Sequence, residues 1–464
     1  MSIDPIRSGA SAIAAAVRSR ATSARAVAEA HLARIDALDG ALGAYTTVTR
    51  GRALAEADAV DAAVAAGRDP GPLAGVPYSV KNLFDIEGVV TLAGSKINRA
   101  DPPARADATL IARMKASGAV LLGALNMGEY AYDFTGENAH DGRSANPHDP
   151  ARMSGGSSGG SGTAAAAGMA AITLGSDTNG SIRVPSSLCG LFGLKPTFGR
   201  LSRAGTFPFV TSLDHLGPLA RSTLDLALSY DAMQGPDAMD PCCTAPGLEP
   251  ATPALARGLS GLRVATLGGY FRQRAMPEAL AAVDSVAAGL GAATTVEWPE
   301  VARARAAAFL ITATEAATFH LPRLRERPGD FDPDVRDRLI AGAMAPASMV
   351  GKAHKLRRWF RDEVLRVFEH VDIVLAPATP CRAPLGGQKT MVLGGVEMPV
   401  RANLGLFTQP VSFVGLPVVA VPVWTAGERL PIGVQVIAPP WREDLALRAA
   451  HALEQAGVCA SKVA

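Results

Sequence analysis

Hydrophobic and polar positions along the chain follow two spacings that alternate with each other. Between residues 23 and 38, and again over 52–66 and 107–117, the pattern predicts helices, with apolar positions recurring at helical spacing in the first of these segments. Short continuous apolar runs are typical of buried strands. These runs cover residues 73–81, 119–125, 172–174, 262–267, 371–375, 418–423 and 432–437.

Strands that alternate with helices over the whole length predict an α/β fold around one sheet. Two loops rich in glycine and serine interrupt this alternation. The first lies within residues 135–162 and leads into an alanine-rich segment, 163–171, which we expect to be a helix. The second, 175–181, follows the short strand at 172–174. The sequence therefore places two loops of small polar residues one helix and one strand apart.

Composition narrows the function classes. The 464 residues carry 45 basic and 43 acidic side chains, and the resulting net charge of +2 is spread without a basic stripe. Nucleic acid and membrane surfaces are therefore poor partners, and no apolar run is long enough for a transmembrane helix. Five cysteines without CxxC spacing indicate neither a zinc site nor a disulfide scaffold, so we expect a cytoplasmic protein.

The glycine-rich run at 155–162 has several interpretations. A flexible linker is one, although a helix and a buried strand follow at once. A phosphate-binding loop would need a lysine that is absent here. The run also satisfies G-x-S-x-G around Ser158, for which Asp372 and His451 would complete a hydrolase triad, but no hydrophobic strand precedes it.

A fourth interpretation takes the two loops together. Ser157 and Ser181 can return to one end of the sheet, where the turn at 177–181 can direct several backbone N–H groups at an oxyanion. A serine nucleophile needs a base, and Lys81 lies in apolar sequence. Burial would lower its pKa from about 10.4 by up to 3–5 units, which would let it act as a base. A lysine that extends from a strand end to water is the alternative.

Three segments, Lys81-Asn82, 155–161 and 177–185, resemble in their order and spacing the amidase signature family. The resemblance extends over nearly the whole chain. It implies a single domain over 1–464 with one large mixed sheet, helices on both faces, and N-terminal helices of roughly 1–70 on or beside the core. It implies neither a metal nor an organic cofactor.

The resemblance also implies a role for each residue. Ser181 is the nucleophile, Ser157 the bridging serine, preceded by a cis peptide bond, and Lys81 the base. The backbone N–H groups of 178–181 form the oxyanion hole, and three further residues support the loops. The residues concerned are Thr178, Asn179, Gly180 and Ser181 for the hole, and Ser158, Asp177 and Arg183 for support.

Segments 81–88, 91–99 and 212–218 resemble those of ureide hydrolases within the family. This implies release of ammonia from a small anionic ureide, 1-carboxybiuret, to give urea-1,3-dicarboxylate. It also implies an oligomer that contains a small helical subunit similar to the smallest subunit of glutamyl-tRNA amidotransferase. A carboxylate on the substrate needs a cation, for which Arg203 and Arg323 are candidates by residue type.

Other functions stay open at this point. An amidotransferase catalytic subunit would release ammonia from glutamine, but we expect glutamine where this chain has His215. Allophanate and oxalurate are alternative ureide substrates. A subunit that keeps the fold without activity is a further alternative, against which the presence of all three residues Lys81, Ser157 and Ser181 argues.

Overall fold

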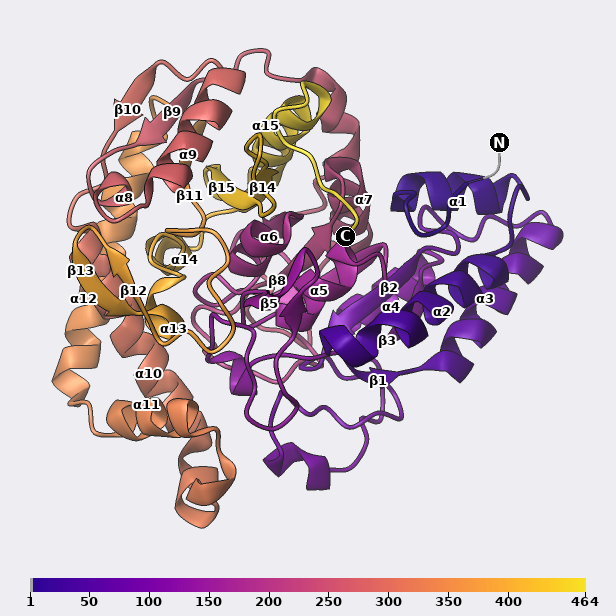
Figure 1. Ribbon diagram of the computed structural model, residues 1–464, viewed down its shortest axis with the longest axis horizontal. Helices are drawn as coiled ribbons and strands as arrows, with labels where there is room; N and C mark the ends of the chain where they lie inside the picture. The colour runs from indigo at the N-terminus through magenta and orange to yellow at the C-terminus, as the bar shows by residue number, and fades with distance from the viewer. Residues whose placement is uncertain (1–2) are drawn as a thin grey trace.

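The structure, a computed structural model, describes residues 3–464 and contains an 11-stranded mixed sheet (Figure 1). The α/β fold with one large sheet is therefore as predicted, and each predicted run contributes a strand. In spatial order the strands are β1 (Tyr45–Val48), β3 (Val120–Leu125), β2 (Pro77–Lys81), β6 (Ile172–Ser176), β8 (Leu216–Ala220), β7 (Phe192–Lys195), β14 (Val418–Val423), β15 (Ile432–Ile437), β11 (Ile373–Pro377), β9 (Val264–Leu267) and β10 (Thr294–Val296).

Both parallel and antiparallel pairs occur in the sheet, and β1 at one edge is antiparallel to β3. β2 is parallel to both β3 and β6, and β9 is parallel to both β10 and β11, whereas the strands in the centre pair antiparallel. Two small hairpins lie outside the sheet. They consist of β4 (Ala145–Asn146) with β5 (Asp149–Met153), and β12 (Thr390–Leu393) with β13 (Val396–Pro399).

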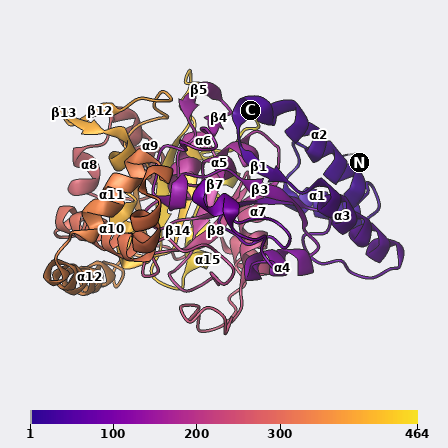
Figure 2. The ribbon, with the colours of Figure 1, turned by 90° about the horizontal axis from the view of Figure 1, so that it is seen from below.

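Helices cover both faces of the sheet. Figure 2 shows α5 and α6 on one side and α4, α7 and α15 on the other. The helices are α1 (Ala10–Arg18), α2 (Ala24–Leu42), α3 (Arg50–Ala65), α4 (Thr109–Ala116), α5 (Gly159–Ala166), α6 (Arg183–Cys189), α7 (Thr223–Met233), α8 (Tyr270–Gln273), α9 (Pro277–Gly289), α10 (Val301–Glu326), α11 (Pro333–Ala343), α12 (Ala347–Val367), α13 (Val400–Asn403), α14 (Gln409–Val414) and α15 (Glu443–Gln455). Short 3₁₀ helices cover Ile97–Ala100, Glu129–Ala131, Thr252–Arg257 and Pro328–Asp330.

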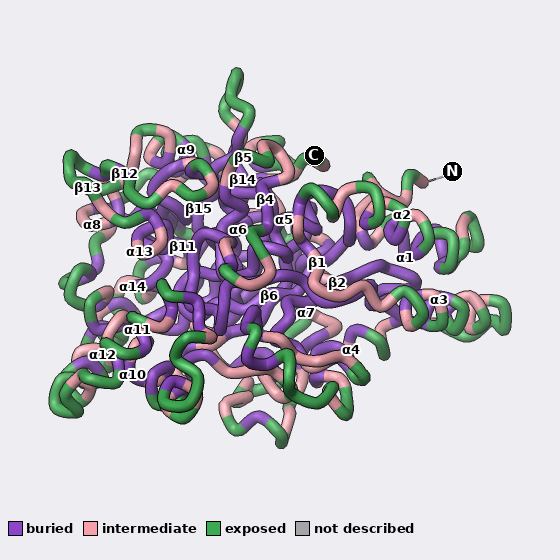
Figure 3. The backbone as a smooth tube through the Cα atoms, turned by 60° about the horizontal axis from the view of Figure 1, so that its bottom comes forward, coloured by how far each residue is buried: buried purple, intermediate pink, exposed green. Residues whose placement is uncertain are grey.

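The two ends of the sheet carry different helices. At one end α2 packs on β2 and β3, and α3 packs on β3 and α2. At the other end α10 packs against α11 and α12 (Figure 1). The central strands are buried along their whole length (Figure 3). Within residues 3–464 no helix combines the length and the apolar character that crossing a membrane requires.

One predicted helix begins earlier than expected. The pattern places it at 163–171, but α5 covers Gly159–Ala166 and so begins inside the glycine run. A Cβ atom on Gly160 would overlap the carbonyl oxygen of Ala44 and the backbone of Asn126. Close packing thus requires glycine in this helix, and the tertiary contact overrides the low helix propensity of glycine.

Candidate active site

Three segments of the chain converge at one edge of the sheet. Lys81 is the last residue of β2, and the loop that contains Ser181 follows β6. Because β2 and β6 are adjacent and parallel, their carboxyl ends lie at the same edge. Ser157 lies two residues before α5, which packs against both strands. Parallel pairing therefore brings the first and second serine loops to the predicted lysine.

Lys81 is completely buried and contacts two hydroxyl groups. Its Nζ lies 2.6 Å from Ser157 Oγ and 2.9 Å from Ser176 Oγ. Burial lowers the pKa of Lys81 to about 7, although the negative charges of Asp214, Asp177 and Asp133 act in the opposite direction. The alternative of a lysine that extends to water is therefore wrong.

The peptide bond between Gly156 and Ser157 is cis, as the family resemblance implies. A side chain at position 156 would overlap the carboxylate of Asp133. Asp133 in turn accepts hydrogen bonds from the backbone N–H groups of Thr135 and Gly136. The loop thus packs closely around the bond that presents Ser157 to Lys81.

Ser181 lies in the second loop and is 3% exposed. Among residues 3–464 its hydroxyl makes no hydrogen bond, and it is not hydrogen-bonded to Ser157. A side chain on Gly180, whose φ is 144°, would overlap Thr408 Oγ1. Glycine at this position therefore lets the loop lie against α14, with the Ser181 hydroxyl left free.

The backbone of the second loop presents unused donors. Within the described chain the N–H groups of residues 178–181 have no hydrogen-bond partner. Buried N–H groups without partners are rare in folded proteins. Four in succession therefore form a site that is suited to a developing negative charge.

An ion pair without solvent exposure holds this loop in place. Asp177 accepts hydrogen bonds from both Nε and Nη2 of Arg183 at 2.9 Å. Burial alone would raise the pKa of Asp177, but the charge and the hydrogen bond of Arg183, together with the charges of Lys195 and His215, outweigh burial and lower the pKa. Arg183 also donates to the carbonyl of Thr408 and to the side chain of Gln435. The pair therefore connects the loop to α6, α14 and β15.

Other contacts fix the two loops relative to each other. Ser158 Oγ donates to the carbonyl of Ser176 and accepts from its N–H, which joins the start of α5 to the end of β6. Thr178 Oγ1 donates to Asp214 at 2.5 Å, and Asn179 Nδ2 donates to Thr312. Asp214 accepts two further hydrogen bonds from backbone N–H groups.

A small cavity of about 20 Å³ adjoins Ser181. Two arginines line it. Arg401 forms ion pairs with Asp133, Asp332 and Asp334, so its charge is compensated. Arg338 has no carboxylate partner among residues 3–464, and its guanidinium lies 4.1 Å from the centre of the Tyr132 ring. The other lining residues are Ala131, Tyr132, Asp133, Phe134, Thr178, Asn179, Phe209, Phe309, Thr312, Ala402 and Gln409.

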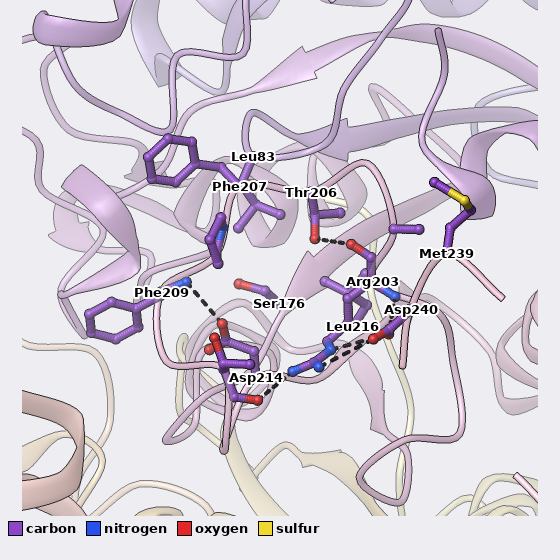
Figure 4. A pocket seen from close by; sticks show the side chains of 13 residues that line it. Leu83, Ser176, Arg203, Thr206, Phe207, Phe209, Asp214, Leu216, Met239 and Asp240 are labelled. Atoms are coloured by element: carbon purple, nitrogen blue, oxygen red, sulfur yellow. Dashed lines mark hydrogen bonds and ion pairs between the residues drawn. The ribbon is translucent and has the colours of Figure 1, made fainter. Parts of the chain in front are cut away.

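Arg203 and Arg323, the candidates by residue type for binding a substrate carboxylate, do not line this cavity. Arg203 pairs with Asp240 and lines a second cavity, shown in Figure 4, which shares Phe209 with the first. Arg323 lies over the rings of Phe207 and Phe319. No motif in the sequence marks Arg338, Arg401 or Ser176, because their positions depend on how distant segments pack.

The hydrolase triad with Asp372 and His451 is wrong. Asp372 pairs with Arg263, and His451 interacts with Thr223. Among residues 3–464 Ser158 Oγ binds only the backbone of Ser176. Within the described chain no cluster of three histidine, cysteine or acidic residues is arranged to hold a metal ion.

Comparison with known proteins agrees with this geometry. The family model Amidase matches residues 26–447. The chain is 57% identical over 447 residues to the AtzE chain of the 1-carboxybiuret hydrolase of Pseudomonas sp. (strain ADP), covering 96% of this chain and 98% of that protein. It is 35% identical over 471 residues to a glutamyl-tRNA(Gln) amidotransferase subunit of Koribacter versatilis (strain Ellin345). This match covers 95% of this chain and 96% of that protein.

Solved structures extend the comparison. One is described as an unexpected vestigial protein complex that reveals the evolutionary origins of an s-triazine catabolic enzyme. It matches with a TM-score of 0.97 and 56% identity over 98% of this chain and 100% of that chain. A bacterial aryl acylamidase of the amidase signature family matches with a TM-score of 0.89 and 25% identity. This match covers 98% of this chain and 97% of that chain. The chain therefore belongs to the amidase signature family and is an amide-bond hydrolase.

Proposed function

We propose that this enzyme hydrolyses 1-carboxybiuret to urea-1,3-dicarboxylate and ammonia, with Ser181, Ser157 and Lys81 as catalytic residues. The observation that carries the proposal is the contact of 2.6 Å between Lys81 Nζ and Ser157 Oγ in a fully buried setting. A lysine whose pKa is about 7 is partly neutral at neutral pH. It is then able to accept a proton from the serine beside it.

The proposed reaction begins with two linked proton transfers. Ser157 passes its proton to Lys81 and takes one from Ser181, whose Oγ attacks the terminal amide carbonyl. Since Ser157 and Ser181 are not hydrogen-bonded here, their hydroxyls must approach each other when substrate binds, as catalytic hydrogen bonds often do. The oxyanion accepts hydrogen bonds from the N–H groups of residues 178–181.

The second half of the reaction returns the protons. Ser157 gives its proton to the departing nitrogen and regains one from Lys81, so that ammonia leaves and Ser181 carries the acyl group. Water then attacks the acyl-enzyme by the same route and restores Ser181. Ser158, Asp177 and Arg183 hold the loops without touching the substrate, and their contacts support this role.

The cavity beside Ser181 supports an anionic substrate. Arg338 forms no ion pair with a carboxylate of the described chain, although Asp133 and Asp334 lie near it, and its Nη1 has no hydrogen-bond partner among residues 3–464. A guanidinium binds carboxylate oxygens in a planar arrangement. We therefore assign the carboxylate of 1-carboxybiuret to Arg338.

A substrate screen tests this function. Ammonia release is measured with 1-carboxybiuret, biuret, allophanate, oxalurate, glutamine and simple aliphatic amides. We expect the highest kcat/KM for 1-carboxybiuret and a much lower value for biuret, which lacks the carboxylate. Equal values for these two, or a preference for glutamine, would contradict the proposal. Ser181→Ala should lower ammonia release at least about 1000-fold while leaving the protein folded.

We further infer that the chain works in the cytoplasm in a complex with a small helical subunit. Free thiols at all five cysteines support a reducing compartment. The relative that is 56% identical was solved as a protein complex. An apolar groove between α10, α11 and α12, lined by residues such as Phe319, Ala343 and Val350, supports a bound helix.

The charges around this groove indicate the kind of helix. Residues 347–361 include five basic and no acidic side chains, whereas the acidic residue in the groove lining, Glu315, accepts hydrogen bonds from Ser212. A second copy of this chain would place like charges together in a symmetric contact. An acidic amphipathic helix complements the groove in both charge and hydrophobicity. We therefore place the small subunit on this surface.

A further inference from the structure

Lys81 has a second partner that the proposed triad does not use. Ser176 is the last residue of β6, and its Oγ lies 2.9 Å from Lys81 Nζ. Ser157 lies 2.6 Å from the same nitrogen. Among residues 3–464 these two hydroxyls are the only hydrogen-bond partners of Lys81 Nζ.

The direction of the lysine lone pair matters for proton transfer. A neutral primary amine has two N–H donors and one lone pair, and it can rotate about its terminal C–N bond. To accept the proton of Ser157, the lone pair must point at Ser157 Oγ. A hydrogen bond from one N–H to Ser176 Oγ stops the rotation in an orientation that leaves the lone pair available.

Ser176 is itself held firmly. Its backbone carbonyl and N–H both bind Ser158 Oγ, at 3.2 and 3.3 Å. Its pairing with Leu216 of β8 fixes it from the other side. The hydroxyl that contacts Lys81 is therefore attached to a rigid strand end, next to the loop of the bridging serine.

Ser176 also differs from Lys81 and Ser157 in its surroundings. Both of these are fully buried, whereas Ser176 is 4% exposed and lines the second cavity. Figure 4 shows it among Leu83, Phe207, Phe209 and Asp214. The charged groups that face the lysine are Asp214, Asp177 and Asp133, and Arg203 and Asp240 pair across the same cavity.

We propose that Ser176 is a positioning residue, which directs the lone pair of Lys81 toward Ser157 and contacts the lysine from the side of the second cavity. This inference rests on the proposed function of Lys81 as the base. It assigns to the site a fourth residue, whose hydroxyl touches neither the substrate nor Ser181.

Two variants separate positioning from folding. Ser176→Ala removes the hydroxyl, and Ser176→Thr keeps it with a side chain that suits a strand. We expect Ser176→Ala to lower kcat about 10- to 100-fold with little change in KM, because substrate binding does not involve this residue. Ser176→Thr should recover most of the activity. Thermal unfolding of both variants establishes that they are folded.

The pH profile of kcat distinguishes positioning from a general loss of structure. The hydrogen bond to Ser176 favours the charged form of Lys81, because bonds from an ammonium group are stronger than those from an amine. Its removal should shift the acidic limb of the Ser176→Ala profile to lower pH. A folded Ser176→Ala enzyme with wild-type kcat and an unshifted limb would overturn the inference.

The proposed function has its own controls. If Lys81→Ala or Ser181→Ala retained activity, the proposed function would fail whatever Ser176 does. If both were inactive and Ser176→Ala matched the wild type, only the role of Ser176 would be wrong. If kcat falls in Ser176→Ala and Ser176→Thr does not recover it, the role of the hydroxyl is also contradicted.

Discussion

At the scale of single residues, the properties of Lys81 depend on contacts that no short segment of sequence contains. Its apolar neighbours allow burial, although periodicity alone favours a lysine that extends to water, and in the structure burial lowers its pKa. The contact with Ser157 depends on a loop that begins more than seventy residues later. The family resemblance was needed to connect the two, while Ser176 and Arg338 carry no local signal and became visible only in the structure.

The pKa of Lys81 predicts the pH dependence of the reaction. The neutral amine is the active form, so kcat should rise with pH through a limb near pH 7 and level off above it. Steady-state ammonia release between pH 5 and 9 measures this limb. A profile that is flat from pH 5.5 to 8 would contradict the assignment of Lys81 as the base.

Arg338 predicts a selective loss of affinity. Arg338→Ala should lower kcat/KM for 1-carboxybiuret by about 100-fold or more, since a charge-assisted contact to the carboxylate is removed. Hydrolysis of biuret should change far less. Arg323→Ala is a matched control, because Arg323 does not line the cavity. Equal losses on both substrates would assign Arg338 to folding instead of carboxylate binding.

At the scale of elements, the loop between β6 and α6 depends on charges buried beneath it. The small residues of this loop suggested an oxyanion hole, and the structure leaves the N–H groups of 178–181 without partners in the described chain. The ion pair of Asp177 with Arg183 lies under this turn and fixes its shape. The sequence indicates the turn itself, and the resemblance indicates that Asp177 and Arg183 support the loops, but their pairing is seen only in the structure.

Breaking this pair should have a large effect on stability. Asp177→Asn leaves the buried guanidinium of Arg183 without a countercharge, and such changes cost about 3–5 kcal/mol of unfolding free energy. Activity should fall as the loop loosens. Urea unfolding measures the first effect. Asp36→Asn, which affects an exposed pair with Arg50, is the control and should change stability much less.

At the scale of the whole molecule, the sequence predicts strands better than their arrangement. Continuous apolar runs identify buried strands well, but they carry no information about direction. The centre of the sheet is antiparallel because β8 (Leu216–Ala220), whose glycine and proline hide it from the pattern, lies between β6 and β7. The single-domain organisation stays a prediction, although one hydrophobic core extends from Ala10 to Cys459.

Exposed hydrophobic side chains are concentrated on one part of the surface, where we place the proposed partner. Five of the ten large hydrophobic side chains that are exposed in residues 3–464 lie between positions 319 and 359. They lie on α10, α11 and α12 or in the turn between α11 and α12, and Phe319 lines the groove between these helices. The five residues are Phe319, Ile340, Met344, Met349 and Trp359. A surface of this kind is typical of a binding site.

Acidic substitutions on this surface should prevent binding of the small helical partner. Met344 and Met349 are 78% and 49% exposed, so the double variant Met344→Glu, Met349→Glu should fold normally. It removes apolar contact and opposes an acidic partner helix in charge. Co-expression with a small helical protein similar to the smallest subunit of glutamyl-tRNA amidotransferase, followed by size-exclusion chromatography, measures the complex. Leu248→Glu, on an exposed loop outside the groove, is the control and should leave the complex intact. Retention of the complex by the double variant would place the partner on another surface, and a chain that is stable and fully active alone would show that it needs none.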